Sequence, residues 1–222
     1  ATLAAPGGPG MSAVLVAVVG AESTGKTTLA LQVAQALQGR GLDAVVVPET
    51  LRDFCVQHGR TPHVHEQADI ARAHSDRIEH ALGQHQVVLA DTTALMTAVY
   101  SEFVFGDRSL YEPAVLAHRR ADLTLLTALD LPWEADGLQR DGPHVREPVD
   151  HLVRQTLIGH GLSFAVVSGQ GPKRLASALS VVEHLLDAPE RAARTQGQPR
   201  WRWVCESCDD GDCEQRHWLP QG

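Results

Sequence analysis

The chain has few cysteines outside its C-terminal end. Of its 4 cysteines, only Cys55 lies in the main body of the sequence. Disulfide bonds therefore cannot form a framework for this body, which, together with the nucleotide-binding motif described below, favours a reducing compartment. We expect the protein to be cytoplasmic.

Long apolar runs and an excess of basic residues are also missing. No run approaches the length of a membrane span, so we expect no membrane partner. Residues 1–12 lack the basic start and apolar core of a signal peptide, and we expect a flexible extension or a cloning remnant there, with Met11 as a candidate native start. The 19 basic against 27 acidic residues leave a net charge of −8, which disfavours a general nucleic-acid binder without excluding one.

The 222 residues, 43% of them hydrophobic, suit one α/β domain with a small appendage. Apolar runs rich in Val and Leu alternate with segments of helical periodicity, which predicts a five-stranded parallel sheet with helices on both faces. The predicted strands are 13–20, 43–48, 86–91, 122–127 and 163–169. The predicted helices are 26–38, one from about residue 49, 66–82, 94–104, 112–119, 147–159 and 172–187.

The segment GAESTGKT, residues 20–27, follows the first predicted strand and precedes a helix. It fits the phosphate-binding loop G-x-x-x-x-G-K-[ST] in the context that motif requires. Gly20 and Gly25 allow backbone amides to point at phosphate oxygens, and Lys26 adds a charge for the β- and γ-phosphates. The hydroxyl of Thr27 is a ligand for Mg²⁺. We therefore predict a P-loop fold that binds ATP.

The predicted nucleotide site extends beyond these four residues. Arg174 follows the loop after the last predicted strand and is a candidate for contacting the base or the phosphates, with an exposed helix arginine as an equal alternative. The predicted nucleotide-binding residues are Gly20, Glu22, Ser23, Thr24, Gly25, Lys26, Thr27, Thr28 and Arg174.

Carboxylates stand at the ends of several predicted strands, where an open parallel sheet binds its ligands. Asp91 is the natural partner of Thr27 in holding Mg²⁺. Glu49 is placed to accept the proton of an acceptor hydroxyl, and Arg52 follows on the same helix face. The alternatives are a helix N-cap for Glu49 and a surface ion pair for Arg52. With Lys26, Asp91 and a lid arginine, these two form the predicted catalytic set.

The polar segment 130–147 interrupts the alternation of strands and helices. P-loop kinases carry a closing lid in this position, and a lid arginine stabilises the transferred phosphoryl group. Arg140 is our first choice for this residue and Arg146 the second, with an ordinary surface loop as the alternative. We expect the kinase domain to span 13–187 and a polar linker to span 188–200.

Five stretches together resemble the ribosylnicotinamide kinase domain of NadR-type proteins, a family within the P-loop superfamily. They are GAESTGKTTL, PETLRD, DTTALMTAVYSEFVFG, DLTLLTALDLPWEADGLQRD and SFAVVSGQGPKRLASAL. The resemblance covers roughly residues 13–187. It implies phosphorylation of the 5′-hydroxyl of nicotinamide riboside by ATP, giving nicotinamide mononucleotide. Larger members also carry an adenylyltransferase domain and a DNA-binding domain, and we do not expect those functions here.

Nicotinamide riboside is a cation with an aromatic ring, which suits an acidic protein that offers aromatic side chains. Tyr100, Phe103 and Trp133 are candidates for stacking, although each is also a candidate core residue. A polynucleotide 5′-hydroxyl kinase, or a nucleoside or nucleotide kinase, uses the same elements and remains an alternative. A regulatory ATP-binding module with a partner-binding tail is another. Nothing in the sequence indicates an oligomeric state.

The last 22 residues, 201–222, hold Cys205, Cys208, Cys213 and His217. Three thiolates and an imidazole make a closed tetrahedral set for structural zinc, and metal would supply most of the folding energy of so small a module. A disulfide, a redox-active pair and a disordered tail are the alternatives. The form is similar to a zinc knuckle, which would indicate single-stranded nucleic acid, but the tail is not strongly basic.

Overall fold

The computed structural model describes residues 13–134 and 142–187. The strands are β1 (Val14–Val19), β2 (Ala44–Val47), β3 (Val87–Asp91), β4 (Leu123–Thr127) and β5 (Ala165–Val167). The α-helices are α1 (Lys26–Gln38), α2 (Thr50–His58), α3 (Gln67–Leu82), α4 (Ala94–Phe105), α5 (Tyr111–His118), α6 (Arg146–Gly159) and α7 (Gly171–Leu186). Two 3₁₀ turns, η1 (Val64–Glu66) and η3 (Pro143–Val145), precede α3 and α6.

The five strands form one parallel sheet in the order β2-β3-β1-β4-β5. The predicted five-stranded α/β architecture is therefore confirmed. β1 lies at the centre of this order, and five of its six residues are buried because the sheet is covered on both faces. Its register sets Val18 beside Asp91 of β3 and Val19 beside Leu126 of β4. The carboxyl ends of these three strands consequently meet at one edge.

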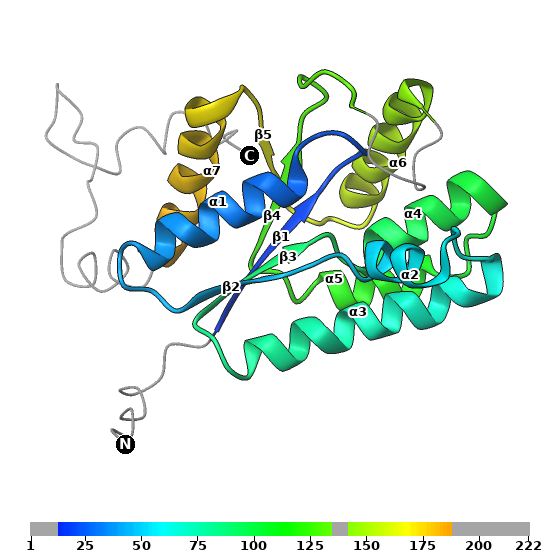
Figure 1. Cartoon of the computed structure of the whole chain (residues 1–222), viewed down its shortest axis with the longest axis horizontal. Helices are drawn as coiled ribbons and strands as arrows, with labels where there is room; N and C mark the ends of the chain where they lie inside the picture. The colour runs from blue at the N-terminus through cyan, green and yellow to red at the C-terminus, as the bar shows by residue number, and fades with distance from the viewer. Residues whose placement is uncertain (1–12, 135–141, 188–222) are drawn as a thin grey trace, which may run out of the picture. The chain divides into compact units, whose positions relative to one another are not determined.

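Helices cover both faces of the sheet, as Figure 1 shows. α1 and α7 lie on one face, where Arg40 and Glu183 form an ion pair between the end of α1 and α7. The helices α3, α4, α5 and α6 lie on the other face. This division follows from right-handed crossovers, because β1 leads outward to β2 while the later strands return across the sheet.

Two apolar clusters hold the layer of helices α3–α6 against the sheet. In one, Val19 and Leu126 pack against α4, α5 and α6. In the other, Leu15 and Val88 pack against α3 through Ile78. A fully buried Val or Leu side chain contributes about 1.5–3 kcal/mol relative to an exposed one, so these contacts fix the strand ends firmly. In the ranges 13–134 and 142–187, no helix combines the length and apolar character needed to cross a bilayer.

Candidate active site

The loop between β1 and α1 adopts a backbone that only glycine accommodates at its first position. Gly20 has a φ of 146°, and a Cβ atom there would lie 2.2 Å from Oγ1 of Thr127. Gly25, at the other end of the loop, has a φ of 73° and precedes the first residue of α1. The two glycines of the sequence motif thus stand where the chain turns sharply and where it passes close to β4.

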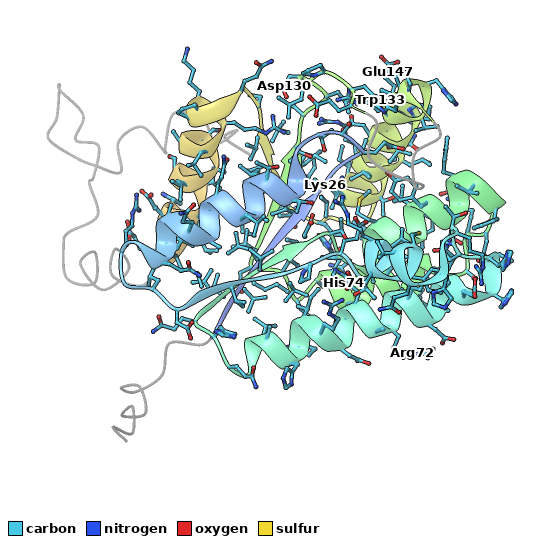
Figure 2. The ribbon with its side chains drawn as sticks, in the orientation of Figure 1. Lys26, Arg72, His74, Asp130, Trp133 and Glu147 are labelled. Atoms are coloured by element: carbon cyan, nitrogen blue, oxygen red, sulfur yellow. The ribbon has the colours of Figure 1, made fainter. Side chains whose placement is uncertain are left out.

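Hydrogen bonds inside the loop hold it in shape. The ammonium group of Lys26 donates to the carbonyl oxygen of Ala21 over 2.7 Å. The hydroxyl of Thr24 also donates to this carbonyl over 2.7 Å and lies 2.7 Å from Oγ1 of Thr127. Lys26 lies at the start of α1, where the helix end adds its own positive potential (Figure 2). The loop is thereby preorganised for an anion.

Asp91 and Thr27 form the pair that the sequence predicts for a divalent cation. Asp91 ends β3 and is only 2% exposed. Its Oδ2 accepts the hydroxyl hydrogen of Thr27 over 2.6 Å, while its buried Oδ1 has no hydrogen-bond partner among the described residues. Mg²⁺ prefers oxygen ligands and usually takes one or two from the protein, with phosphate and water completing the shell. The donor set and the orphaned oxygen both fit that ion.

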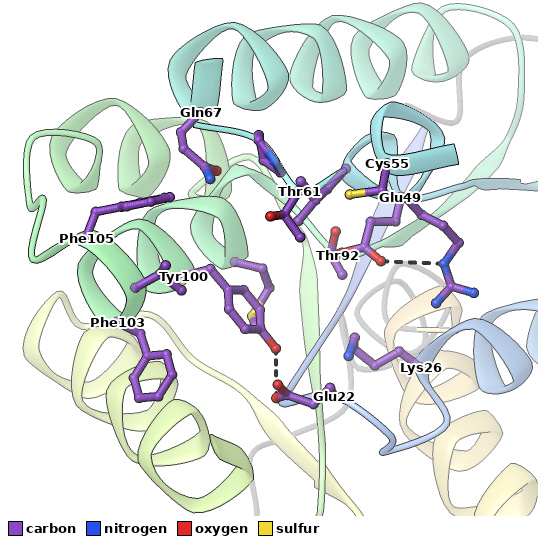
Figure 3. A pocket seen from close by; sticks show the side chains of 15 residues that line it. Glu22, Lys26, Glu49, Cys55, Thr61, Gln67, Thr92, Tyr100, Phe103 and Phe105 are labelled. Atoms are coloured by element: carbon purple, nitrogen blue, oxygen red, sulfur yellow. Dashed lines mark hydrogen bonds and ion pairs between the residues drawn. The ribbon is translucent and has the colours of Figure 1, made fainter. Parts of the chain in front are cut away.

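Two cavities open at this edge of the sheet. The first, called here the phosphate cleft, is lined by Ser23 to Leu29, with Leu131, Glu134 and Arg174. The second, called here the apolar pocket, is lined by Glu22, Glu49, Gln67, Tyr100, Phe103 and Phe105, among others (Figure 3). Lys26 and Arg52 line both cavities. A group transferred from one cavity to the other would therefore pass these two cations.

Glu49 and Arg52 lie side by side at the start of α2. Glu49 occupies the N-cap position, but its side chain makes no capping hydrogen bond. Its carboxylate lies 3.9 Å from Nε of Arg52 and lines the apolar pocket. Arg52 takes part in an ion pair, as the alternative from the sequence proposed, but it also faces both cavities. Arg52 thus lies where the two cavities adjoin, and Glu49 faces the apolar pocket beside it.

Glu22 is predicted to bind nucleotide, and the structure places its side chain in the other cavity. It lines the apolar pocket and is absent from the lining of the phosphate cleft. Its carboxylate, in a residue only 6% exposed, accepts the hydroxyl hydrogen of Tyr100 over 2.9 Å. The physical reason is the sharp turn after Gly20, which directs this side chain toward α4. Phe103 also lines the apolar pocket, whereas Trp133 lies half-buried after β4 (Figure 2).

Arg174 lines the phosphate cleft, but its guanidinium group is bonded to the protein. One terminal nitrogen donates to the carbonyl oxygen of Thr24 over 2.7 Å, and the other donates to Asp130 over 2.8 Å. Burial raises the pKa of Asp130, but the amide of Gly169 and the Arg174 guanidinium outweigh burial and lower it. Arg174 therefore braces the phosphate loop against the ends of β4 and β5.

Both described ends of the predicted lid are attached to the site. The hydroxyl of Ser23 donates to the carbonyl of Glu134 over 2.7 Å and accepts its amide hydrogen over 2.9 Å. Arg146 is buried and donates to the carbonyl of Leu131 over 2.9 Å, so it holds the base of this segment. Arg140 lies outside the described residues. The predicted zinc ligands also lie outside them, and they are Cys205, Cys208, Cys213 and His217.

Some residues near the site carry no recognisable sequence signal. The imidazole of His74 is buried and lies 3.0 Å from the hydroxyl of Thr50 and 3.1 Å from the carbonyl of Thr92. It connects the loops that carry Glu49 and Asp91. Burial lowers the pKa of His74, which favours the neutral ring. Gln67, buried at the start of α3, was likewise not predicted from the sequence.

A protein-family model matches the part of the chain that carries this site. A family model described as an AAA domain matches residues 15–174. The chain belongs to the AAA domain family. Within it, the predicted resemblance to NadR-type proteins is confirmed by 28% identity over 158 residues to the trifunctional NAD biosynthesis/regulator protein NadR of Salmonella typhimurium and of Escherichia coli. The match covers 68% of this AAA-domain chain and only 37% of each relative.

Solved structures resemble the fold of this AAA domain. A NadR protein in complex with NR superposes with a TM-score of 0.65 at 18% identity, over 78% of this chain and 52% of that one. A NadR protein in complex with NAD and AMP-PNP gives 0.62 at 20% identity, over 78% and 50%. Thymidylate kinase from Ehrlichia chaffeensis gives 0.56 at 14% identity, over 79% and 100%. These likenesses identify a P-loop kinase-like fold.

Proposed function

We propose that this protein is an ATP-dependent kinase that phosphorylates the 5′-hydroxyl of nicotinamide riboside to give nicotinamide mononucleotide. One observation carries the proposal: Lys26 and Arg52 line both the phosphate cleft and the apolar pocket. An enzyme that only hydrolyses ATP needs no second cavity, whereas a kinase must bring a donor and an acceptor together. Homology to NadR and the kinase-like fold support the same reading.

The phosphate side of the site has clear roles for its residues. The amides of the loop from Gly20 to Gly25 and the ammonium of Lys26 bind the phosphate chain. Thr27 and Asp91 would hold Mg²⁺, and the ion would neutralise charge on the phosphate oxygens. Arg174 contributes indirectly, because its bond to the Thr24 carbonyl keeps the loop in its binding shape.

The acceptor side supplies the base and the binding surface. Glu49 takes the proton of the 5′-hydroxyl, and Arg52 beside it stabilises negative charge on the group in transfer. Tyr100 and Phe103 offer aromatic surface to the pyridinium ring, and the buried carboxylate of Glu22 balances its positive charge. A small cationic riboside therefore matches the apolar pocket in charge and ring character.

The remaining predictions complete the proposal. Arg140 acts from the lid when it closes, and the tail from 201 to 222 binds one structural zinc ion through its three cysteines and His217. The kinase domain spans 13–187, and the linker 188–200 joins it to the tail. The donor and acceptor cavities meet at Lys26 and Arg52, so their meeting depends on neither Arg140 nor the tail.

The test is an ATP-consumption screen of the full chain with three acceptor classes: nicotinamide riboside, ordinary nucleosides and 5′-hydroxyl oligonucleotides. We expect turnover with nicotinamide riboside and formation of its 5′-phosphate, detected by mass. Lys26→Ala is the control, because it removes the ammonium group that serves the phosphates. Turnover confined to oligonucleotides or to another nucleoside would refute the substrate assignment. ATP binding without turnover of any acceptor would instead favour the regulatory module.

A further inference from the structure

Gln67 places an amide group in the wall of the apolar pocket. It is the first residue of α3 and only 4% exposed. Its Oε1 is buried, and within residues 13–134 and 142–187 no group forms a hydrogen bond with it. Buried polar atoms in folded proteins are nearly always hydrogen-bonded, so this acceptor calls for a donor that the protein does not supply.

The position of Gln67 in the pocket indicates where that donor would come from. Figure 3 shows Gln67 and Phe105 at one end of the pocket and Lys26 and Glu49 at the other. The reacting hydroxyl of an acceptor must lie near Lys26, because that residue also lines the phosphate cleft. In a riboside, the base and the 5′-hydroxyl lie at opposite ends of the molecule. The base is therefore the part that reaches Gln67.

We infer that Gln67 recognises the carboxamide of the acceptor's ring and selects an amide-bearing ring over one without the amide. This inference rests on the proposed function and deepens it. The Oε1 of Gln67 accepts an N–H from the carboxamide, and its own NH₂ group is able to donate to the carboxamide oxygen. A primary amide is the group that offers both complements at once.

The same arrangement disfavours a ring that carries a carboxylate. An ionised carboxyl group has no hydrogen to give to Oε1, and it loses hydration on entering a pocket walled by Phe103 and Phe105. A ring with no substituent leaves Oε1 unpaired, as it is in the free protein. A site built to hydrogen-bond one substrate group rejects analogues that lack it much more strongly than a purely apolar site does.

The experiment combines a protein variant with a ligand variant. Wild type and Gln67→Leu are assayed as full chains with nicotinamide riboside and with the ribosylpyridinium that lacks the carboxamide. We expect Gln67→Leu to raise the KM for nicotinamide riboside about 10- to 100-fold, with kcat within about threefold and the KM for ATP unchanged. The two proteins should be equally poor with ribosylpyridinium. Gln57→Leu, the same change at an exposed position of α2, is the matched control.

A purely structural role for Gln67 gives a different pattern. Since Oε1 has no partner to lose, we expect the melting temperature of Gln67→Leu to equal or exceed that of wild type. A lower melting temperature with equal losses for both acceptors would indicate a structural role and overturn the inference. An unchanged KM for nicotinamide riboside would overturn it too, while the proposed function stands. If wild type does not phosphorylate nicotinamide riboside, the proposed function fails and the inference falls with it.

Discussion

The hydroxyl of Thr27 donates to Oδ2 of Asp91 over 2.6 Å and so joins the first turn of α1 to the end of β3. The bond is made by one carboxylate oxygen, and the other, Oδ1, is buried without a partner among the described residues. The two side chains thus present adjacent oxygens beside the phosphate loop. A magnesium ion would supply the positive charge that suits these oxygens.

Asp91→Asn tests this arrangement. The amide keeps the shape of the side chain but removes its negative charge, so we expect turnover at limiting Mg²⁺ to fall about 100-fold or more. Activity should recover partly as the Mg²⁺ concentration rises. The measurement is initial rate against Mg²⁺ concentration. Asp69→Asn, an exposed surface partner of Arg72, is the control. A Mg²⁺ dependence like that of wild type would contradict the metal role of Asp91.

Glu49→Gln tests the proposed base. Loss of the carboxylate removes the proton acceptor but leaves the phosphate loop intact, so kcat should fall about 100- to 10,000-fold with the KM for ATP unchanged. Steady-state kinetics with both substrates separate the two effects. Glu79→Gln, which only disrupts a surface ion pair with Arg120, should behave as wild type. Undiminished turnover of Glu49→Gln would eliminate the residue as the base.

Gly20→Ala tests the close approach of the loop to β4. The added Cβ would lie 2.2 Å from Oγ1 of Thr127, at a φ of 146° that side chains rarely adopt. We expect a loss of about 3 kcal/mol or more in the free energy of unfolding. Gly41→Ala is the matched control, because Gly41 has a φ of 84° but an added Cβ would meet no atom within 4 Å, so it should lose only about 1 kcal/mol. Denaturant unfolding measures the stability of both variants. Equal losses of stability in Gly20→Ala and Gly41→Ala would contradict the predicted clash with Thr127.

The buried His118 predicts a dependence of stability on pH. Burial lowers its pKa from 6.5 to about 4. At a pH between 6.5 and about 4, His118 is protonated in the unfolded chain but neutral in the folded one. The contribution of the neutral ring to the free energy of unfolding is therefore complete above pH 6.5 and is lost as the pH falls toward about 4. The loss amounts to about 3 kcal/mol. Denaturation of wild type and His118→Gln across this range measures it. His118→Gln should lose less free energy of unfolding over this pH range than wild type. The exposed His58→Gln is the control and should behave as wild type. Parallel curves of stability against pH for wild type and His118→Gln would contradict the prediction.

The predicted zinc site has a direct test. Metal analysis of the full chain, purified under reducing conditions, should find about one zinc per protein. Cys208→Ser should lose most of the metal, because three remaining ligands hold zinc less tightly. Cys55→Ser is the matched control, since Cys55 lies buried in the main body, and it should keep the metal. Wild-type protein without zinc would reject the site.

The fold was largely predictable because its determinants are local. β1 reads as a buried strand since its apolar residues are consecutive, and α1 begins and ends at the predicted residues, Lys26 and Gln38. The phosphate loop is a continuous motif whose geometry depends on its own glycines. The pairing of Thr27 with Asp91 was also predictable, because the carboxyl ends of parallel strands converge.

The sequence by itself determined the strands, the helices and the phosphate loop, since hydrophobic periodicity and glycine placement act between near neighbours in the chain. Only the tertiary structure decided that Glu22 turns toward Tyr100, that Arg174 braces Thr24, and that Gln67 faces the apolar pocket. Each of these relationships joins residues from different elements, and a polar residue on a helix looks the same in sequence whether it meets solvent or a cavity. Packing of the helices against the sheet makes that choice.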